Sequence, residues 1–288
     1  MRDLVFGFFA FLTTAVAPLL GADAGIVTIV EGPGRLLRGP TWFTLAEGGR
    51  VHEGDVVDLG GRSRAQVELA DGALVSLSGP ATLYLASIPS HDGKPAGSTE
   101  LFLEGGWLKL AAGTARGGLL LRTPLDTVSL ADAVAVLRAE AGADAVFVER
   151  GAAQLAGLDR GAPPGASRDA RGGEFWTRAA GKPFTSEPRP SPSFLSGMPP
   201  QFMDPLPVRA AKMRESRVDL AVAREVSYAE ARPWLSGPYR KTFLKRLRPR
   251  LSDPAFRAAV ETDIRAYPEW DRILHPERYL PKGEGEKR

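Results

Sequence analysis

The chain has 288 residues, a formal net charge of +3 and no cysteine, which excludes disulfides, thiolate nucleophiles, cysteine-ligated metals and a lipidated N-terminal cysteine. Hydrophobic residues make up 43% of it, which suits one large or two modest packed domains. The charge is uneven, because residues 206–288 carry 19 Lys and Arg against 12 Asp and Glu, whereas residues 1–205 carry 18 against 22. The C-terminal part therefore favours an acidic partner.

The first 24 residues have the pattern of a secretory signal peptide. A 17-residue apolar stretch, Leu4 to Leu20, follows the basic Arg2, and Ala22-Asp23-Ala24 offers a small-x-small cleavage site. The alternative is an uncleaved membrane anchor, for which the stretch is at the lower limit of length. We expect cleavage before Gly25, export of the body of the protein and a periplasmic location, with an N-terminal membrane anchor if the signal is retained.

Residues 65–77 predict a β-hairpin. Apolar and polar residues alternate on both sides of an Asp-Gly turn, as in strands with one buried face. A two-residue loop would pair apolar with polar positions, whereas the three-residue loop Ala70–Gly72 places Leu69 opposite Ala73 and keeps the apolar set on one face. We therefore expect a positive φ at Gly72.

Short apolar runs separated by turns predict strands through most of residues 25–180. The Ala-rich stretch 131–141 is interpreted as strand rather than helix, because β-branched Val alternates with Ala there. Many short strands with frequent turns are typical of a β-sandwich, a barrel or a solenoid-like stack. Besides the hairpin, we expect strands at residues 26–30, 36–37, 42–45, 101–103, 107–110, 128–130, 133–137, 144–148, 151–155 and, as the last strand, 174–178.

The order and spacing of several motifs resemble the FecR domain, a periplasmic β-domain known from regulators that sense outer-membrane receptors. The resemblance covers roughly residues 25–180 and implies a FecR-like all-β domain, twisted solenoid-like or sandwich-like. Those regulators carry a cytoplasmic anti-sigma segment before their membrane helix, whereas only Met1 to Asp3 precede the apolar stretch here, so we expect a periplasmic accessory role. The matching segments are Glu53–Val57, Gly61 with Ser63–Ala65, Val67–Gly72, Thr82–Leu85, Glu104–Leu108 and Leu121–Pro124.

A Pro-rich linker is expected at residues 181–212. Residues 159–209 hold 10 of the 24 prolines, which disfavours regular structure. The linker is too apolar for free coil, so we expect it to lie against a domain surface. Its apolar residues are Phe184, Phe194, Leu195, Met198 and Phe202.

A basic α-helical module is expected at residues 213–288. Ser227 and Glu230 form a capping box, Pro238 can open a second helix that ends before Pro249, and Asp253-Pro254 is a helix start. We expect Pro233 to keep the first helix short. The third helix carries the apolar stripe Phe256, Val260, Ile264 and Tyr267, and a last short helix follows at residues 269–274.

No pattern in the chain points to catalysis or to a metal. The histidines His52, His91 and His275 lie far apart, and the adjacent Ser90-His91-Asp92 lies in a Pro- and Gly-rich loop rather than in a triad arrangement. Motifs of serine hydrolases, phosphate-binding loops and dinucleotide sites are missing from the sequence. We expect no enzymatic activity, no cofactor and no catalytic, cofactor-binding or metal site.

The candidate binding feature is a basic run in the second predicted helix. It is interpreted either as a solvated face behind an apolar stripe or as a patch that binds an anion or a partner, with the charges projecting away from the core. The patch comprises Arg240, Lys241, Lys245, Arg246, Arg248 and Arg250.

Three functions remain open from the sequence. The first is a non-enzymatic exported FecR-like protein that binds a protein partner in the cell envelope, in a signalling or accessory role, through exposed β-edges. The second is a protein that binds an anionic envelope polymer through the helical module. The third, a hydrolase, is disfavoured by the missing motifs. Nucleic acid and a small-molecule substrate are not expected as partners.

Overall fold

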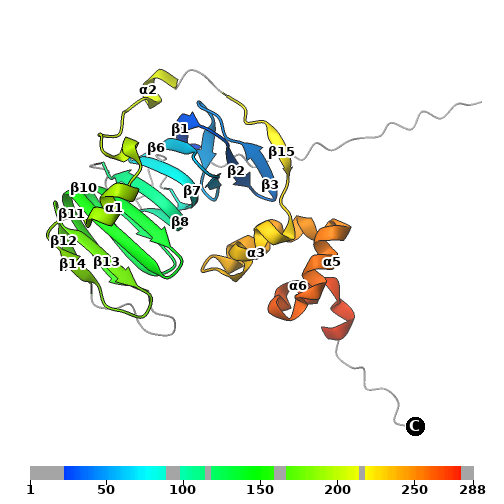
Figure 1. Ribbon diagram of the computed structural model, residues 1–288. Helices are drawn as coiled ribbons and strands as arrows, with labels where there is room; N and C mark the ends of the chain where they lie inside the picture. The colour runs from blue at the N-terminus through cyan, green and yellow to red at the C-terminus, as the bar shows by residue number, and fades with distance from the viewer. Residues whose placement is uncertain (1–22, 89–97, 114–117, 159–166, 214–217, 280–288) are drawn as a thin grey trace, which may run out of the picture.

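The computed structural model of the protein describes residues 23–88, 98–113, 118–158, 167–213 and 218–279. The fold is mainly β with short helices towards the C-terminus, as the sequence predicted (Figure 1). Residues 1–22 of the expected signal and His91 with its neighbours lie outside the described residues. In the described part of the chain, no helix combines the length and the apolar character needed to cross a membrane.

Within the described ranges, the strands form one continuous 15-stranded sheet, and most neighbouring strands are antiparallel. The strands are β1 (Asp23–Glu31), β2 (Gly34–Arg38), β3 (Thr41–Thr44), β4 (Arg50–His52), β5 (Val56–Leu59), β6 (Arg64–Leu69), β7 (Leu74–Ser87), β8 (Thr99–Ala111), β9 (Leu119–Arg122), β10 (Asp126–Glu140), β11 (Ala143–Gly157), β12 (Arg168–Arg171), β13 (Phe175–Ala179), β14 (Thr185–Glu187) and β15 (Val222–Glu225). The helices are α1 (Pro192–Gly197), η1 (Pro200–Phe202), α2 (Ala210–Met213), α3 (Tyr228–Ser236), α4 (Arg240–Leu247), η2 (Arg248–Ser252), α5 (Pro254–Thr262), η3 (Ile264–Ala266), α6 (Pro268–Leu274) and η4 (Pro276–Tyr279).

Four long strands bend near their middle and change partners there. The first half of β7 pairs with β6 and the second with β5, while β11 pairs first with β13 and then with β12. Likewise β10 pairs with β9 and then with β8. At the bend of β8, Gly106 has a φ of 105°, and a Cβ there would lie 2.4 Å from the carbonyl oxygen of Pro80. Only glycine allows this approach, so β7 and β8 can bend together and fold the sheet into two layers.

The two layers enclose the main core. Alternate side chains of each strand point between the layers, as the two-residue period requires. Leu83 and Leu103 come from one layer, Val75 and Leu110 from the other, and all four are fully buried in a single hydrophobic cluster.

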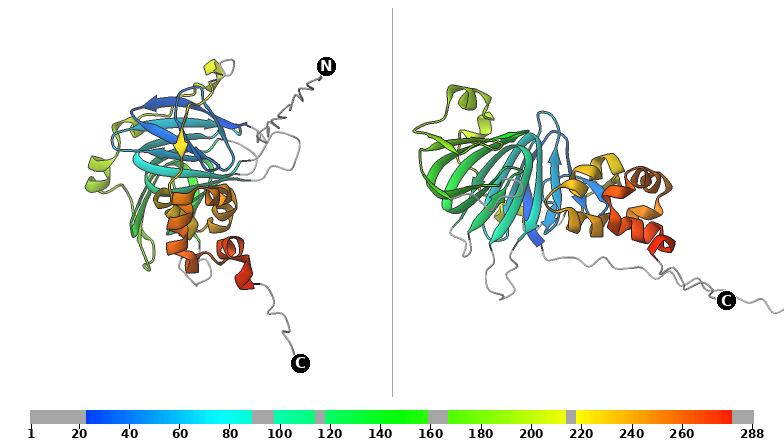
Figure 2. Two further views of the ribbon diagram at one scale, coloured as in Figure 1. Left: turned by 90° about the vertical axis from the view of Figure 1, so that its right-hand side faces the viewer. Right: turned by 90° about the horizontal axis from the view of Figure 1, so that it is seen from below.

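Both outer faces are partly covered by later parts of the chain. The outward residues Tyr84 and Phe102 pack under the helices α3–α6, while Val136 and Phe175 on the other layer pack under α1 and η1. Figure 2 shows the helices to one side of the sheet and α1 on another. This double burial explains continuous apolar runs such as Leu83-Tyr84-Leu85, which alternation on one face cannot explain.

The predicted hairpin is confirmed. Residues 65–69 and 73–77 pair with Val67 opposite Val75 and Ala65 opposite Leu77. The Leu69 amide donates to the Ala73 carbonyl at 2.9 Å, and Gly72 has a φ of 89°. The three-residue loop therefore sets the register.

The predicted run of short strands is wrong in its lengths. Three pairs of predicted strands are single strands, because glycines and a positive-φ residue at the bends turn the chain without ending the ladder. Residues 131–141 are strand, as predicted, but β13 is followed by β14 and β15, so it is not the last strand. The merged pairs are 101–103 with 107–110 in β8, 128–130 with 133–137 in β10, and 144–148 with 151–155 in β11.

Two of the predicted helix starts are confirmed. Both halves of the Ser227 capping box are present, and the Asp253 side chain caps α5. Pro233 lies inside α3, which is short, as expected, and ends at Ser236. The prediction for Pro238 was wrong, because this residue lies in the turn before α4 rather than in its first turn.

The residues predicted as a linker carry elements of their own. The range 181–212 contains β14, α1 and η1, and its Phe194, Met198 and Phe202 are buried against the sheet, as expected for a segment lying on a domain surface. The range 213–288 contains β15 as well as helices. Whether residues 25–180 fold alone stays a prediction.

Candidate functional site

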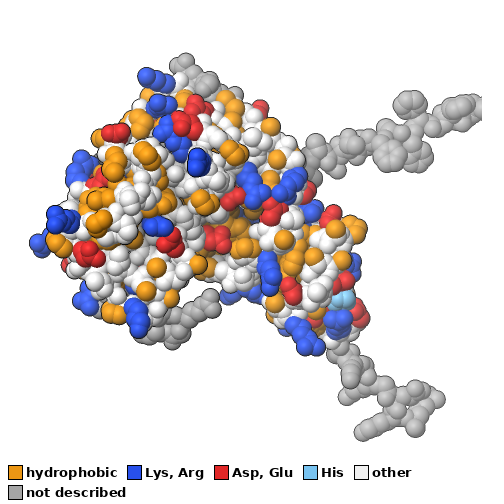
Figure 3. Space-filling view, viewed as in Figure 1, with side chains coloured by type: hydrophobic (Ala, Val, Ile, Leu, Met, Phe, Trp, Pro, Cys, Tyr) orange, Lys and Arg blue, Asp and Glu red, His pale blue; other side chains and the backbone are white. Residues whose placement is uncertain are grey.

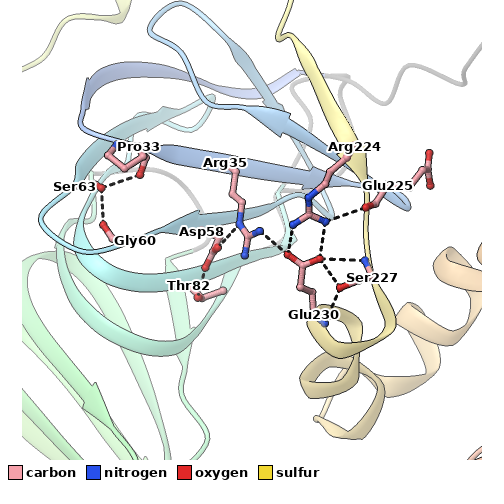
Figure 4. A network of polar contacts seen from close by, with 10 residues as sticks. All are labelled: Pro33, Arg35, Asp58, Gly60, Ser63, Thr82, Arg224, Glu225, Ser227 and Glu230. Atoms are coloured by element: carbon pink, nitrogen blue, oxygen red, sulfur yellow. Dashed lines mark hydrogen bonds and ion pairs between the residues drawn. The ribbon is translucent and has the colours of Figure 1, made fainter. Parts of the chain in front are cut away.

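Glu230 in the first turn of α3 is the centre of a polar network between the helices and the sheet (Figure 4). Its carboxylate accepts hydrogen bonds from Arg224 at 2.7 and 2.8 Å and from Arg35 at 2.6 Å. The hydroxyl and amide of Ser227 donate to it as well. These bonds, those from Arg224 foremost, hold the pKa of Glu230 well below its usual range. Glu230 therefore stays ionised and pairs with both arginines.

Arg35 connects this network to the body of the sheet. Its guanidinium lies 4.0 Å from the ring centroid of Trp42 and donates to Asp58 at 2.6 Å. Asp58 also accepts from the Thr82 hydroxyl at 2.8 Å, so three strands contribute to the contact. We call Arg35, Asp58, Thr82, Arg224, Ser227 and Glu230 the junction network.

Aromatic packing lies beneath the junction network. Trp234 of α3 stacks on Phe243 of α4 with ring centroids 4.7 Å apart, and Tyr84 of β7 lies 5.1 Å from Phe243. The buried rings and the charged bonds together fix the helices on the outer face of the sheet.

Residues 218–226 form an edge of the sheet next to the junction. Val218 bridges Gly49, the Thr44 amide donates to the Ala221 carbonyl at 2.9 Å, and β15 pairs with β3. Among the described strands, β15 pairs with β3 alone. All four β15 residues are exposed, and the apolar Val222 is 68% exposed.

The charged side chains of β15 are engaged within the molecule. Arg224 pairs with Glu230, and Glu225 accepts from the Thr41 hydroxyl at 2.9 Å and lies 3.7 Å from Arg250. Charged residues commonly protect an edge strand from pairing with another chain. Here they are held by neighbouring groups, so they protect the edge less.

The six-residue basic patch divides into two sets. Arg240 forms a two-pronged pair with Glu269 at 2.6 and 2.8 Å, Arg246 donates to the carbonyl of Gly54, and Arg250 donates to the carbonyl of Val226 at 3.1 Å. These three arginines tie the module together or to the sheet. The expectation that all six charges project away from the core is therefore wrong for them.

The other three patch residues, Lys241, Lys245 and Arg248, are exposed. Their spacing of i, i+4 and i+7 places them along one side of α4 and the start of η2, away from the buried Phe243 and Leu247. We call these three residues the cationic stripe. Figure 3 shows basic side chains on the outer surface of the helices.

The structure brings none of the histidines into a catalytic arrangement among the residues it describes. His52 lies 3.3 Å from Asp23 at the start of β1, and His275 lies 3.5 Å from Glu277 at the other end of the molecule. Within the described ranges, no cluster of three or more His, Asp or Glu side chains could hold a metal ion.

A buried carboxyl pair was missed by the sequence reasoning. Asp126 and Asp144, in strands β10 and β11, are buried with Arg178, which donates to Asp126 at 3.0 Å, while Thr123 donates to Asp144. One oxygen of each carboxyl has no hydrogen-bond partner. Burial foremost, with the nearby Asp144 charge, raises the pKa of Asp126 to about 8. Isolated acidic residues in strands give no sequence signal for such a pair.

The edge strand was also missed, although a signal was present. Val218, Leu220 and Val222 alternate with other residues at a period of two, which is a strand pattern.

Comparisons with known proteins give limited information. No family model matches the chain, and no curated protein matches it. Two crystal structures of a "putative anti-sigma factor" from Parabacteroides distasonis are similar at 15% identity, with TM-scores of 0.39 and 0.40. The matches cover 46% and 49% of this chain and 59% and 64% of those chains, less than two thirds of their length. Both TM-scores lie below 0.5, so the likeness establishes neither a family nor a partner.

Proposed function

We propose that the protein is an exported accessory protein of the cell envelope that acts without catalysis, by binding another protein. The observation that carries this proposal is the free edge at residues 218–226. The unpaired amide and carbonyl groups of an edge strand offer a template on which a partner can add a strand. Main-chain hydrogen bonds would supply affinity, and exposed side chains such as Val222 would supply contact area.

The position of the edge supports this role. The junction network and the aromatic packing hold residues 224–230 against both the sheet and the helices. A partner strand would therefore meet an edge that is already ordered, which lowers the entropy lost on binding.

The edge can be tested by a charge placed on it. We expect Val222→Asp to reduce recovery of the partner after periplasmic cross-linking by about tenfold or more, because an aspartate disfavours strand addition. The matched control is Ile273→Asp, which changes another exposed aliphatic residue, on α6. Equal recovery with Val222→Asp and with the unchanged protein would contradict binding at this edge.

Export rests on the apolar stretch at residues 4–20 and on the resemblance to the FecR domain. Asp23 and Ala24 belong to β1, and the carbonyl of Ala24 accepts from the Ala70 amide at 2.8 Å. Cleavage before Gly25 would remove both residues from the sheet. We therefore propose that the mature chain begins at Asp23. Intact-mass measurement on periplasmic protein tests this, and a retained Met1 or an N-terminus at Gly25 would contradict it.

A second candidate function is binding of an anionic envelope polymer. The observation that favours it is the cationic stripe, because Lys241, Lys245 and Arg248 are exposed on one side of α4 while the other patch arginines are engaged. Binding through exposed charges weakens steeply with salt, since the Debye length is only about 8 Å at physiological ionic strength.

The stripe is tested by its removal. Replacing Lys241, Lys245 and Arg248 by Gln should abolish low-salt retention on anionic vesicles or cell-wall polymer. The control replaces three exposed cations of the sheet domain, Arg62, Arg150 and Lys182, by Gln and makes the same change in net charge. If both triple variants lose retention equally, the effect is one of net charge and the stripe is not a site.

A further inference from the structure

The outer face of the layer that contains β6 is polar and yet buried. Gln66, Glu68, Ser76 and Lys109 alternate with inward apolar residues, so they lie on the outside of the two-layer sheet, where water would normally solvate them. Each of the four is nevertheless at most 5% exposed. Residues 203–213, which we call the strap, cover this face (Figure 1).

The sheet holds this segment by its main chain. The Lys109 ammonium donates to the carbonyls of Phe202 at 2.6 Å and Asp204 at 3.0 Å, and also to the Glu149 carboxylate. Gln66 donates to the carbonyl of Pro207 at 2.7 Å. Glu68 accepts from the amide of Arg209 at 2.5 Å. These contacts do not depend on the side chains of the strap.

The strap fits loosely in its place. Met203 and Val208 are 60% and 74% exposed, so they contribute little apolar burial. A cavity of about 560 Å³ lies between residues 200–209 and the sheet near Gln66, and another of about 280 Å³ lies near Val208. The apolar anchors Phe194, Met198 and Phe202 lie outside the strap and pack on another part of the sheet.

We propose that this face is a binding groove for an extended, proline-containing segment of a partner protein, and that the strap occupies it as an internal ligand. Lys109 and Gln66 are donors, which suits a segment whose prolines offer carbonyls but no N–H groups. Glu68 then accepts one amide at the end of such a segment, as it does from Arg209, two residues after Pro207. The inference rests on the proposed role in protein binding and names a partner class at a surface separate from β15.

Exchange of the strap for a partner segment is physically accessible. The polar side chains of the groove can be solvated by water when the strap leaves, and the main core between the layers stays closed. A tethered strap competes at a high effective concentration, so the groove of the unchanged protein is blocked to weak ligands.

The test uses the full chain with residues 203–213 replaced by a Gly/Ser segment of equal length, which lacks Pro205 and Pro207 and therefore loses more conformational entropy when it lies in the groove. Its probe is a labelled peptide with the sequence of residues 203–213, and circular dichroism with thermal unfolding verifies the fold of every variant. We expect the strap-replaced protein to bind the peptide about tenfold or more tightly than the unchanged protein does. Peptides with Met203, Asp204 and Val208 changed to Ser should bind equally, because the groove holds the main chain.

Two substitutions in the strap-replaced protein locate the binding. Gln66→Ala with Glu68→Ala should weaken binding of the peptide about tenfold, whereas Gln154→Ala, an exposed glutamine on β11, should leave it unchanged. A folded strap-replaced protein that does not bind the peptide, or that binds it regardless of Gln66 and Glu68, overturns the groove. Dimers of the unchanged protein that disappear on strap replacement would assign the groove to a second copy and overturn the partner class.

These outcomes are independent of the β15 edge. Loss of partner recovery in Val222→Asp with no peptide binding would overturn the groove and keep the proposed function. Peptide binding together with unchanged partner recovery in Val222→Asp would keep the groove and overturn partner binding at the β15 edge.

Discussion

The carboxylate of Glu230 accepts hydrogen bonds from two arginines and from Ser227 at the helix cap, and so connects α3 to the sheet. Because its pKa is lowered in the folded protein, its stabilising effect is present above the ordinary carboxyl pKa and is lost as the pH falls through the folded value. At neutral pH we expect Glu230→Gln to lower the free energy of unfolding by about 1–3 kcal/mol.

The control for Glu230 is the same substitution at an exposed pair. Glu269 pairs with Arg240 by two hydrogen bonds, but it is largely exposed, so Glu269→Gln should cost no more than about 1 kcal/mol. Denaturant unfolding at pH 7 measures both. Equal losses of unfolding free energy in the two variants would show that Glu230 contributes no more to stability than a residue of an ordinary surface ion pair.

The buried Asp126–Asp144 pair predicts a pH dependence of the opposite sign. Burial raises the folded pKa of Asp126, so its contribution to stability is full below the unfolded value and is lost as the pH rises from about 4 to about 8. Asp126→Asn should remove this decline and raise stability at pH 8 by at least about 1.4 kcal/mol, the equivalent of one pKa unit. Melting temperatures of both proteins across this range test the prediction.

The matched control is Asp169→Asn, at an exposed position of β12. It should leave the pH dependence of the melting temperature unchanged. A decline that persists in Asp126→Asn would mean that Asp126 is not the group that binds the proton. Asp126, Asp144 and Arg178 are far apart in the sequence, so only the fold brings the carboxyl pair and its arginine together.

At the scale of elements, local signals were predictable from the sequence. The hairpin at residues 65–77 and the Ser227 cap depend on neighbours within a few positions, and both were confirmed. The bends were not predictable in the same way. In the sequence, the glycines at positions 105 and 106 indicate a turn between two strands. In the structure, β8 continues through them because it pairs there with β7 and β10.

The strap should be among the least stable of the described elements. Each of its main-chain hydrogen bonds contributes roughly 0.5–1.5 kcal/mol, and ordering each of its residues costs about 1–2 kcal/mol, with little apolar burial in return. We expect the Arg209 amide to exchange with solvent deuterium at least about a hundredfold faster than amides in the middle of β8, such as that of Leu108. Exchange at equal rates would contradict a detachable strap.

At the scale of the whole molecule, the division into domains was the hardest feature to predict. The sequence showed a change from strand to helix patterns near residue 213, but not that Tyr84, Phe102 and Trp42 face the helices rather than the main core. Runs that are apolar at every position were the available signal, because they indicate strands buried on both faces. The sequence shows where the basic residues cluster, but which of them are engaged depends on contacts with Gly54 and Val226, far away in the sequence.

The hydrophobic cluster that the helices form with Tyr84, Phe102 and Trp42 of the sheet leads to a prediction for the sheet without the helices. Residues 25–180 contain the main core, so the fragment should keep a β-type circular dichroism spectrum. It should also self-associate and bind a hydrophobic dye, because Tyr84, Phe102 and Trp42 lose their cover. The fragment 23–279 is the control and should do neither. A monomeric fragment 25–180 without dye binding would mean that the helices are separable from the sheet.

Site-specific photo-cross-linking in the living cell tests the central claim, that the protein binds a protein partner at the free edge beside the junction. A cross-linking residue is placed in turn at Ala223 on the edge, at Lys245 on the cationic stripe and at Val208 on the strap. The account predicts a discrete protein adduct from position 223, in the envelope fraction, that disappears with Val222→Asp. No adduct from position 223, or one that Val222→Asp leaves unchanged, would contradict it.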